Sequence, residues 1–392
     1  MTISRKIGIM LTRSSWIRKM FEEGAKLKAK YGADKVYDFS LGNPNLEPPP
    51  IFKEKLLEII NSSQPNSHAY MPNVGYPHVR KAVANYISKE SKVDISENEI
   101  IMTCGAAGGI NVALKAILDP GDEVISPAPY FAEYGFYVDN HGGLFKTVFS
   151  NPDFTLDIDR IESTITEKTK AVIINSPNNP TGQVYSEESL SELGGLLREK
   201  SAKLNRTIYL ISDEPYRKIV YDDTKIPYIY DIYEDSIIVH SYSKDISIPG
   251  ERIGFIAISP KAQYKDDLFN AMAHANRILG FVNAPALIQK VVAEIQGITV
   301  DISEYKRKRD MLCEGLRSYG YNFIVPKGAF YVFPECPIPD DIRFVQGLVE
   351  ENILAVPGSG FGAPGYFRLA FCVSDETIIN AIPGFNRVME RY

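Results

Sequence analysis

Short apolar segments alternate with helical patterns between about residues 98 and 260, and this alternation constrains the fold more than any other feature of the chain. The expected strands are 100–103, 123–126, 171–175, 207–212 and 236–240, and the clearest helices are 106–118 and 186–203. Strands that alternate with helices form a mainly parallel sheet covered by helices on both faces. We therefore expect an α/β fold whose ligand site lies at the carboxyl ends of the strands.

The rest of the chain predicts a smaller α+β domain. A helix is expected over 14–31, where Ser14 and Ser15 can cap it, and a long charged helix over about 290–318. Between them, segment 39–50 (FSLGNPNLEPPP) contains too many prolines for a regular helix or a central strand. We expect a large domain over 46–288 and a small domain formed by 1–45 and 289–392.

Composition excludes several classes of protein. The net charge is −6 and the basic residues are dispersed, so we expect no nucleic-acid partner. No apolar run approaches the roughly 18 residues that a membrane span needs. The four cysteines form no C-x-x-C pair and the five histidines show no metal-ligand spacing, so we expect no metal site. Sparse cysteine predicts a cytoplasmic location.

Polar side chains follow three of the predicted strands. The segment NSPNNPTG, at 175–182, follows the first, Asp213 follows the second, and Lys244 follows the third, with Arg252 eight residues later. Because the carboxyl ends of parallel strands meet at one edge of a sheet, we expect an amide, a carboxylate, an amine and a guanidinium to share one cleft.

This combination of groups suits pyridoxal 5′-phosphate (PLP). The cofactor needs a lysine for a Schiff base and a carboxylate beside its pyridine nitrogen. Its phosphate suits an arginine, whose planar fork binds two oxygens. It also suits the Gly-rich turn at 103–109, which opens a helix and offers backbone N–H groups.

A series of motifs then resembles a known family. SLGNP, HAYMPNVGY, PYF, NNPTG, SDEPY, SYSK, PKGAFYVF and YFRLAF occur in this order from about residue 39 to residue 371. The chain resembles the class I/II aminotransferases of PLP fold type I, the aspartate-aminotransferase-like group. That resemblance implies a large domain with a mainly parallel sheet between helices, a smaller α+β domain, and a homodimer.

The resemblance also implies roles for individual residues. Lys244 matches the Schiff-base lysine, which also moves the proton, and Asp213 matches the partner of the pyridine nitrogen. Tyr216 and Asn179 match the pair that hydrogen-bonds the phenolate oxygen. Arg368 matches the arginine that binds the substrate α-carboxylate, assisted by Gly42 and Asn179.

Further cofactor contacts are implied in the same way. Ser241, Ser243, Arg252, Gly105, Ala106 and Ala107 match the phosphate site, where Ala106 and Ala107 replace the Ser, Thr or Lys of many members. Phe131 matches the aromatic residue that stacks on the ring, although Tyr130 is one register away. Tyr70 matches a tyrosine that reaches the site of the other subunit.

The implied activity is transfer of an amino group from an L-amino acid to a 2-oxo acid by a ping-pong mechanism, of an aspartate/glutamate type if Arg277 binds a distal carboxylate. A PLP-dependent carbon–sulfur β-lyase, or a cyclisation of an S-adenosyl amino acid, is an alternative on the same fold. A non-catalytic regulatory module is an alternative of another class. A nicotinamide oxidoreductase is disfavoured, because the glycine motif at 360–365 contains Pro364 and precedes a strand-like run.

Overall fold

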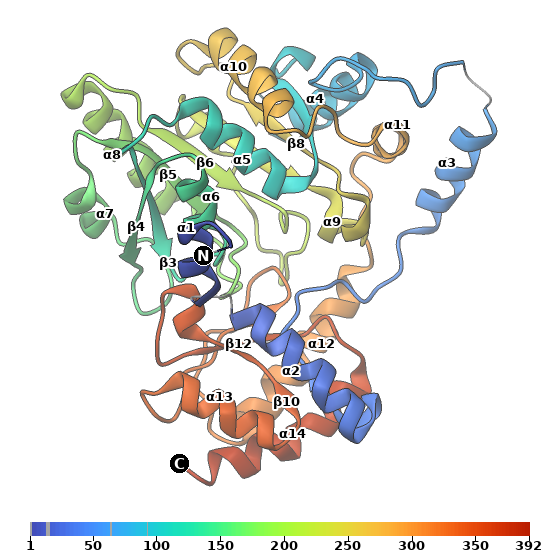
Figure 1. Cartoon of the computed structure of the whole chain (residues 1–392), viewed down its shortest axis with the longest axis vertical. Coiled ribbons are helices and arrows are strands. Elements are labelled where there is room, and N and C mark those ends of the chain that lie inside the picture. Colours follow the sequence, from blue (N-terminus) through green and yellow to red (C-terminus); the bar gives the residue numbers. More distant parts are fainter. Residues whose placement is uncertain (1, 13–15, 63–64, 92) are drawn as a thin grey trace.

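A seven-stranded sheet forms the centre of the computed structural model, which describes residues 2–12, 16–62, 65–91 and 93–392 (Figure 1). In spatial order the strands are β2 (Ile100–Thr103), β8 (Gly254–Ile258), β7 (Ser236–Ser241), β6 (Tyr209–Asp213), β5 (Thr169–Asn175), β3 (Glu123–Ala128) and β4 (Leu144–Phe149). Only β8 runs antiparallel to its neighbours, β7 and β2. The predicted strands and the mainly parallel sheet are therefore confirmed.

Helices cover both faces of this sheet, as its apolar strands require. On one face lie α5 (Gly105–Ile117), α6 (Tyr134–Asn140) and α10 (Lys265–Ile278). On the other lie α4 (Pro77–Ser91), α8 (Glu187–Leu204) and α11 (Ala286–Glu294), with α7 (Ile158–Thr164) beside α8 and α3 (Pro50–Asn61) beside α11. Alternate residues of β5 serve the two cores: Val172 and Ile174 face one, Ala171 and Ile173 the other.

A third hydrophobic cluster lies below the sheet in Figure 1. It involves α2 (Trp16–Tyr31), α12 (Ile302–Ser318), α13 (Asp341–Glu350) and α14 (Asp375–Met389), with the short strands β1 (Tyr37–Asp38), β10 (Ile353–Leu354), β9 (Tyr331–Val332), β11 (Val356–Pro357) and β12 (Phe367–Ala370). Tyr216, Ile219 and Tyr221 also belong to this cluster, so it packs against the segment that follows β6. The domain boundaries given above stay a prediction.

The predicted helix over 14–31 is present as α2, whereas its caps Ser14 and Ser15 lie outside the described residues. The helix α1 (Arg5–Thr12) precedes it, and α9 (Tyr242–Asp245) is a single turn after β7. Short 3-10 helices occupy Ala33–Lys35, Glu97–Glu99, Ile229–Asp231, Pro249–Glu251 and Gly358–Phe361. No described helix is both long and apolar enough to cross a membrane.

One predicted helix is wrong. The segment 290–318 contains the end of α11 and all of α12, separated by an irregular stretch in which Gly297 has a φ of +83°. Asp301 then caps α12, its side chain accepting a hydrogen bond from the Ser303 N–H at 3.0 Å. The helix α11 ends at Glu294, three residues before this glycine, and the acidic N-cap Asp301 starts the next helix, so charge and length alone do not predict the break.

Two adjacent glycines of α8 give the first testable prediction. Gly195 is exposed and a Cβ there would meet nothing within 4 Å, whereas a Cβ on Gly194 would lie 2.8 Å from the Ile232 carbonyl oxygen. We expect Gly195→Ala to raise the free energy of unfolding by about 0.5–1 kcal/mol, because alanine favours the helix. Gly194→Ala gains the same propensity but is expected to destabilise by about 1–3 kcal/mol through overpacking.

Urea unfolding of the two variants and the wild type measures both effects. Because the substitutions are identical and neighbouring, each serves as the control for the other. Equal stabilities of the two variants would contradict the packing of α8 against the segment at Ile232.

Candidate active site

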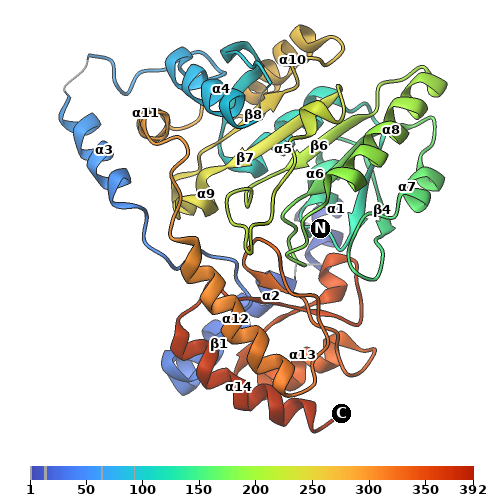
Figure 2. The ribbon, with the colours of Figure 1, turned by 180° about the vertical axis from the view of Figure 1, so that it is seen from behind.

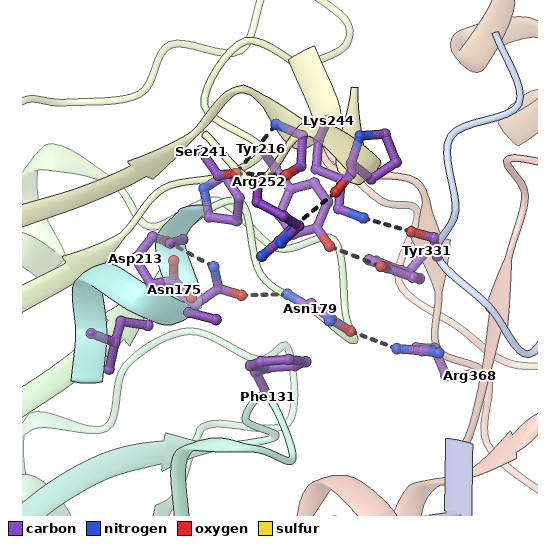
Figure 3. Close-up of a pocket in the computed structure, with 17 residues that line it drawn as sticks. Phe131, Asn175, Asn179, Asp213, Tyr216, Ser241, Lys244, Arg252, Tyr331 and Arg368 are labelled. Carbon is purple, nitrogen blue, oxygen red and sulfur yellow. Dashed lines mark hydrogen bonds between the residues drawn. The ribbon is translucent and has the colours of Figure 1, made fainter. Parts of the chain in front are cut away.

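A cavity of about 290 Å³ lies where the carboxyl ends of β5, β6 and β7 face the third hydrophobic cluster (Figure 3). It is lined by Gly42, Ala106, Ala107, Ile110, Phe131, Asn175, Asn179, Asp213, Pro215, Tyr216, Ser241, Ser243, Lys244, Pro249, Arg252, Tyr331 and Arg368. The structure thus brings together most of the residues that the sequence singled out, from segments more than 300 positions apart. Within the described part of the chain, no cluster of three potential metal ligands occurs.

Strand pairing determines the first part of the site. Asn175 and Asp213 are the last residues of β5 and β6, and they are direct partners in the parallel register. The Asn175 side chain donates to the Asp213 carbonyl oxygen at 2.8 Å and accepts from the Asn179 N–H at 2.7 Å. Asn175 therefore ties the NNPTG loop to the strand that carries Asp213.

Asp213 is a buried carboxylate with spare capacity for hydrogen bonds. Its Oδ2 accepts a hydrogen bond from the Tyr134 hydroxyl at 2.6 Å, while Oδ1 has no partner among the described residues. Burial raises the pKa of this carboxyl to about 7. A buried, unpaired oxygen of this kind is suited to a ligand that presents an N–H group or a positive charge.

Lys244 lies on α9, immediately beyond β7, and lines the cavity. Its ammonium group donates to the Gly42 carbonyl oxygen at 2.7 Å. Burial lowers the pKa of this lysine to about 8, and the positive charges of Arg252 and Arg368 act in the same direction. A lysine with such a pKa is partly neutral near physiological pH, as a nucleophile or a base requires.

Arg368 is the most buried cation of the cavity, with only 2% of its surface exposed. Its guanidinium donates to Asn179 Oδ1 at 3.0 Å and to the Ser40 carbonyl oxygen at 2.5 Å, while Nε has no partner in the described part of the chain. Among the described residues no carboxylate forms an ion pair with it. A buried, uncompensated guanidinium favours an anionic ligand.

The opposite end of the cavity offers donors for a second anion. Arg252 donates to the Pro249 carbonyl oxygen at 2.8 Å and lines the cavity beside Ser241 and Ser243. In the predicted Gly-rich segment 103–109, Thr103 ends β2 and α5 begins at Gly105, so that Ala106 and Ala107 lie in the first turn of the helix. Gly105 has a φ of +75°, a left-handed conformation that favours glycine, and a Cβ there would lie 2.8 Å from Arg252 Nη2.

Two of the predicted residues, Tyr70 and Arg277, lie outside the cavity lining. Phe131 lines the cavity, whereas Tyr130 packs against Phe145 with their ring centroids 5.0 Å apart. Tyr70 has 90% of its surface exposed and does not line this cavity. Arg277 is exposed near the end of α10, beside His274.

Sequence reasoning assigned no role to three residues that the structure places in or beside the site. Tyr331 lies in the PKGAFYVF motif, and Asn175 ends the apolar run 171–175 that precedes the NNPTG motif. Tyr134 follows Phe131 by three residues, and nothing in the sequence pairs it with Asp213. Only the tertiary contact reveals that pairing.

The raised pKa of Asp213 predicts how the stability of the cofactor-free protein depends on pH. The carboxyl titrates near 3.8 when unfolded and near 7 when folded, so the folded state binds more protons between these values. The stabilisation is therefore fully present below about pH 4 and is lost as the pH rises through 7. At pH 8 we expect the free energy of unfolding of Asp213→Asn to exceed that of the wild type by on the order of 2 kcal/mol. At pH 5 the difference in the free energy of unfolding should be smaller.

Asp223→Asn, which changes an exposed carboxyl, is the matched control and should show no such dependence. If Asp213→Asn raises the free energy of unfolding by the same amount at pH 5 and pH 8, the folded carboxyl does not titrate between these pH values.

Comparisons with known proteins agree with this site. A probable aspartate/prephenate aminotransferase of Aquifex aeolicus is 32% identical over 379 residues, covering 93% of each chain. The aspartate/prephenate aminotransferase of Thermus thermophilus is 33% identical, covering 92% of this chain and 93% of the relative. Both names describe a transaminase, which matches a cavity that carries a lysine, a carboxylate and a buried arginine.

Solved structures give the same result. An aminotransferase from Eubacterium rectale superposes with a TM-score of 0.97 at 38% identity, covering 100% of this chain and 99% of the other. The Thermus thermophilus aspartate aminotransferase with maleate superposes with a TM-score of 0.87 at 29% identity, covering 99% and 100%. The sequence model described as aminotransferase class I and II matches residues 34–384. The chain therefore belongs to the class I and II aminotransferases and is a PLP-dependent transaminase.

Proposed function

We propose that this aminotransferase takes an acidic L-amino acid, aspartate or glutamate, as amino donor and a 2-oxo acid as acceptor, with Lys244 as the lysine that carries PLP. The observation that carries the proposal is the buried Arg368 guanidinium, which lacks a carboxylate partner and lines the same cavity as Lys244. The acidic donor is supported by the names of the relatives from Aquifex and Thermus, which are aspartate/prephenate aminotransferases.

The residues of the cavity fit the cofactor. The unpartnered Oδ1 of Asp213 suits a protonated pyridine nitrogen, and Tyr216 and Asn179 suit a phenolate oxygen. Arg252, Ser241, Ser243 and the first turn of α5 suit a phosphate. When bound, PLP supplies an electron-withdrawing ring that stabilises negative charge at the substrate Cα.

The chain's own residues then bind the substrate and move its proton. Arg368 binds the α-carboxylate through its planar fork, and Asn179, which accepts from Arg368, holds the guanidinium in place. Lys244 would hold PLP through a covalent bond to Nζ, and its neutral amine would accept the proton of the substrate Cα. Its lowered pKa keeps part of the amine neutral for this task.

A further part of the proposal concerns the oligomeric state. Tyr70 is exposed, as are Leu57 and Ile60 on α3, which stands at the margin of the molecule in both overall views (Figures 1 and 2). This arrangement supports a homodimer in which Tyr70 reaches the partner subunit's cavity; a single-chain mass in sedimentation would contradict it.

The four free cysteines support a cytoplasmic location, because thiols stay reduced there. A disulfide in protein isolated from cells would contradict that location.

An absorption spectrum with single amino acids tests the function. We expect a visible cofactor band in the wild type and its conversion by aspartate or glutamate. Lys244→Ala should lack this band, and its activity should be at least 10³-fold lower than that of the wild type. Lys261→Ala, at an exposed lysine, is the matched control and should behave as the wild type. Release of pyruvate and ammonia without a 2-oxo acid would instead indicate the β-lyase, and absence of any band would exclude PLP catalysis.

Two arginine variants test substrate recognition. We expect Arg368→Lys to raise the KM of every amino acid by roughly 10-fold to 100-fold, because lysine cannot form the bidentate contact.

Arg277→Ala tests the hypothesis that Arg277 binds the distal carboxylate of a dicarboxylate substrate. If Arg277 selects the distal carboxylate, activity falls with aspartate but not with alanine. Equal losses of activity with aspartate and alanine would show that Arg277 is not the selector.

A further inference from the structure

Tyr331 contacts both Tyr216 and Arg368, which lie in different parts of the cavity. It lies on β9 with 2% of its surface exposed, and Figure 3 shows it between Tyr216 and Arg368. Three independent contacts connect it to groups that the proposed function uses.

The first contact is with the Arg368 guanidinium. In the antiparallel pair of β9 and β12, Tyr331 lies opposite Ala370, which is two residues from Arg368 and on the same face of the sheet. The guanidinium carbon lies 4.6 Å from the centre of the Tyr331 ring and 4.8 Å from that of Phe361. Since no described carboxylate pairs with Arg368, these ring faces supply part of the stabilisation that an ion pair would otherwise give.

The second contact is with the Tyr216 hydroxyl. The two hydroxyl oxygens are 2.8 Å apart, and either group can be the donor. A hydroxyl carries one proton but can accept as well. When Tyr331 donates, the proton of Tyr216 is left for an acceptor in the cavity. Burial raises the pKa of Tyr331 to about 12, so this donor stays protonated at any working pH.

The third contact is with Gly42, whose carbonyl oxygen accepts the hydrogen bond from Lys244. A Cβ placed on Gly42 would overlap the Tyr331 hydroxyl, at 1.8 Å, so the hydroxyl packs directly against the glycine backbone. The same tyrosine oxygen therefore limits the position of the carbonyl group that holds the lysine.

We propose that Tyr331 is a positioning residue for both the cofactor and the substrate parts of the cavity. Its hydroxyl orients the Tyr216 donor, and its ring holds the Arg368 guanidinium in place for the substrate carboxylate. This inference rests on the proposed function, since it assigns Tyr216 to the cofactor and Arg368 to the substrate. The two roles belong to different atoms of one side chain, so substitutions can separate them.

The experiment uses the PLP-loaded enzyme and three variants. Tyr331→Phe removes the hydroxyl and keeps the ring, whereas Tyr331→Leu removes both. Tyr321→Phe is the matched control, because it removes a buried hydroxyl, bonded to the Phe385 carbonyl oxygen at 3.0 Å, that lies outside the cavity. Two quantities are measured: the pH midpoint of the cofactor's absorption change, and the Kd of maleate, a dicarboxylate without an amino group.

We expect Tyr331→Phe to raise the pH midpoint by roughly half a unit to one unit, because Tyr216 then stabilises the cofactor's phenolate less well. Its Kd for maleate should stay within about twofold of the wild type. Tyr331→Leu should show the same shift of the midpoint and also a roughly tenfold weaker binding of maleate. Tyr321→Phe should change neither quantity.

An unchanged midpoint in Tyr331→Phe would overturn the role of the hydroxyl, whether or not the leucine variant folds. An unchanged Kd in a folded Tyr331→Leu would overturn the role of the ring. A wild-type enzyme without a cofactor band would instead contradict the proposed function, so the two failures are distinguishable.

Discussion

Parallel pairing of β5, β6 and β7 is the constraint on which the rest of the site depends. Because these strands are buried on both faces, their side chains are apolar along most of their length, and polar chemistry is confined to their ends. The parallel direction then brings Asn175, Asp213 and Ser241 to one edge. The antiparallel β8 completes the arrangement, since Gly254 lets its backbone approach Gly105 at the start of α5.

Burial of polar groups gives the cavity its chemistry. Removal from water favours the neutral forms, raising the pKa of Asp213 and lowering the pKa of Lys244 and Arg368. Hydrogen bonds compensate only part of this cost, because one Asp213 oxygen and Arg368 Nε have no partner among the residues that the structure describes. Such groups gain more from a complementary ligand than they would on the surface. The same incomplete pairing that reduces the stability of the empty protein therefore favours binding of an anionic substrate and a cationic ring nitrogen.

Local patterns predicted much of the fold, and the failures have physical causes. The strands and α8 were found because their apolar periodicity and caps are local features; Ser186, for example, caps α8 through the Ser189 N–H. The helix expected over 290–318 failed because a backbone with positive φ at Gly297 interrupts a segment whose composition remains helical. Lys244, Asp213 and Arg368 could be singled out because they stand in ordered motifs. Tyr134 stands in none of these motifs, and Tyr331 stands in one, but their hydrogen bonds join residues 79 and 115 positions apart and are visible only in the fold.

The amino-acid sequence by itself determined the order of strands and helices, the mainly parallel sheet, the set of reactive groups at its edge and the family to which they point. These properties follow from hydrophobic periodicity and from residue types at strand ends, which act over short distances along the chain. Only the tertiary structure decided which of those groups meet, which atoms remain unpaired and how far each pKa shifts. Those properties depend on burial and on contacts between distant segments, such as Tyr331 against Gly42 and Arg368, and the free energy of a buried charge is set by all the atoms around it rather than by its neighbours in sequence.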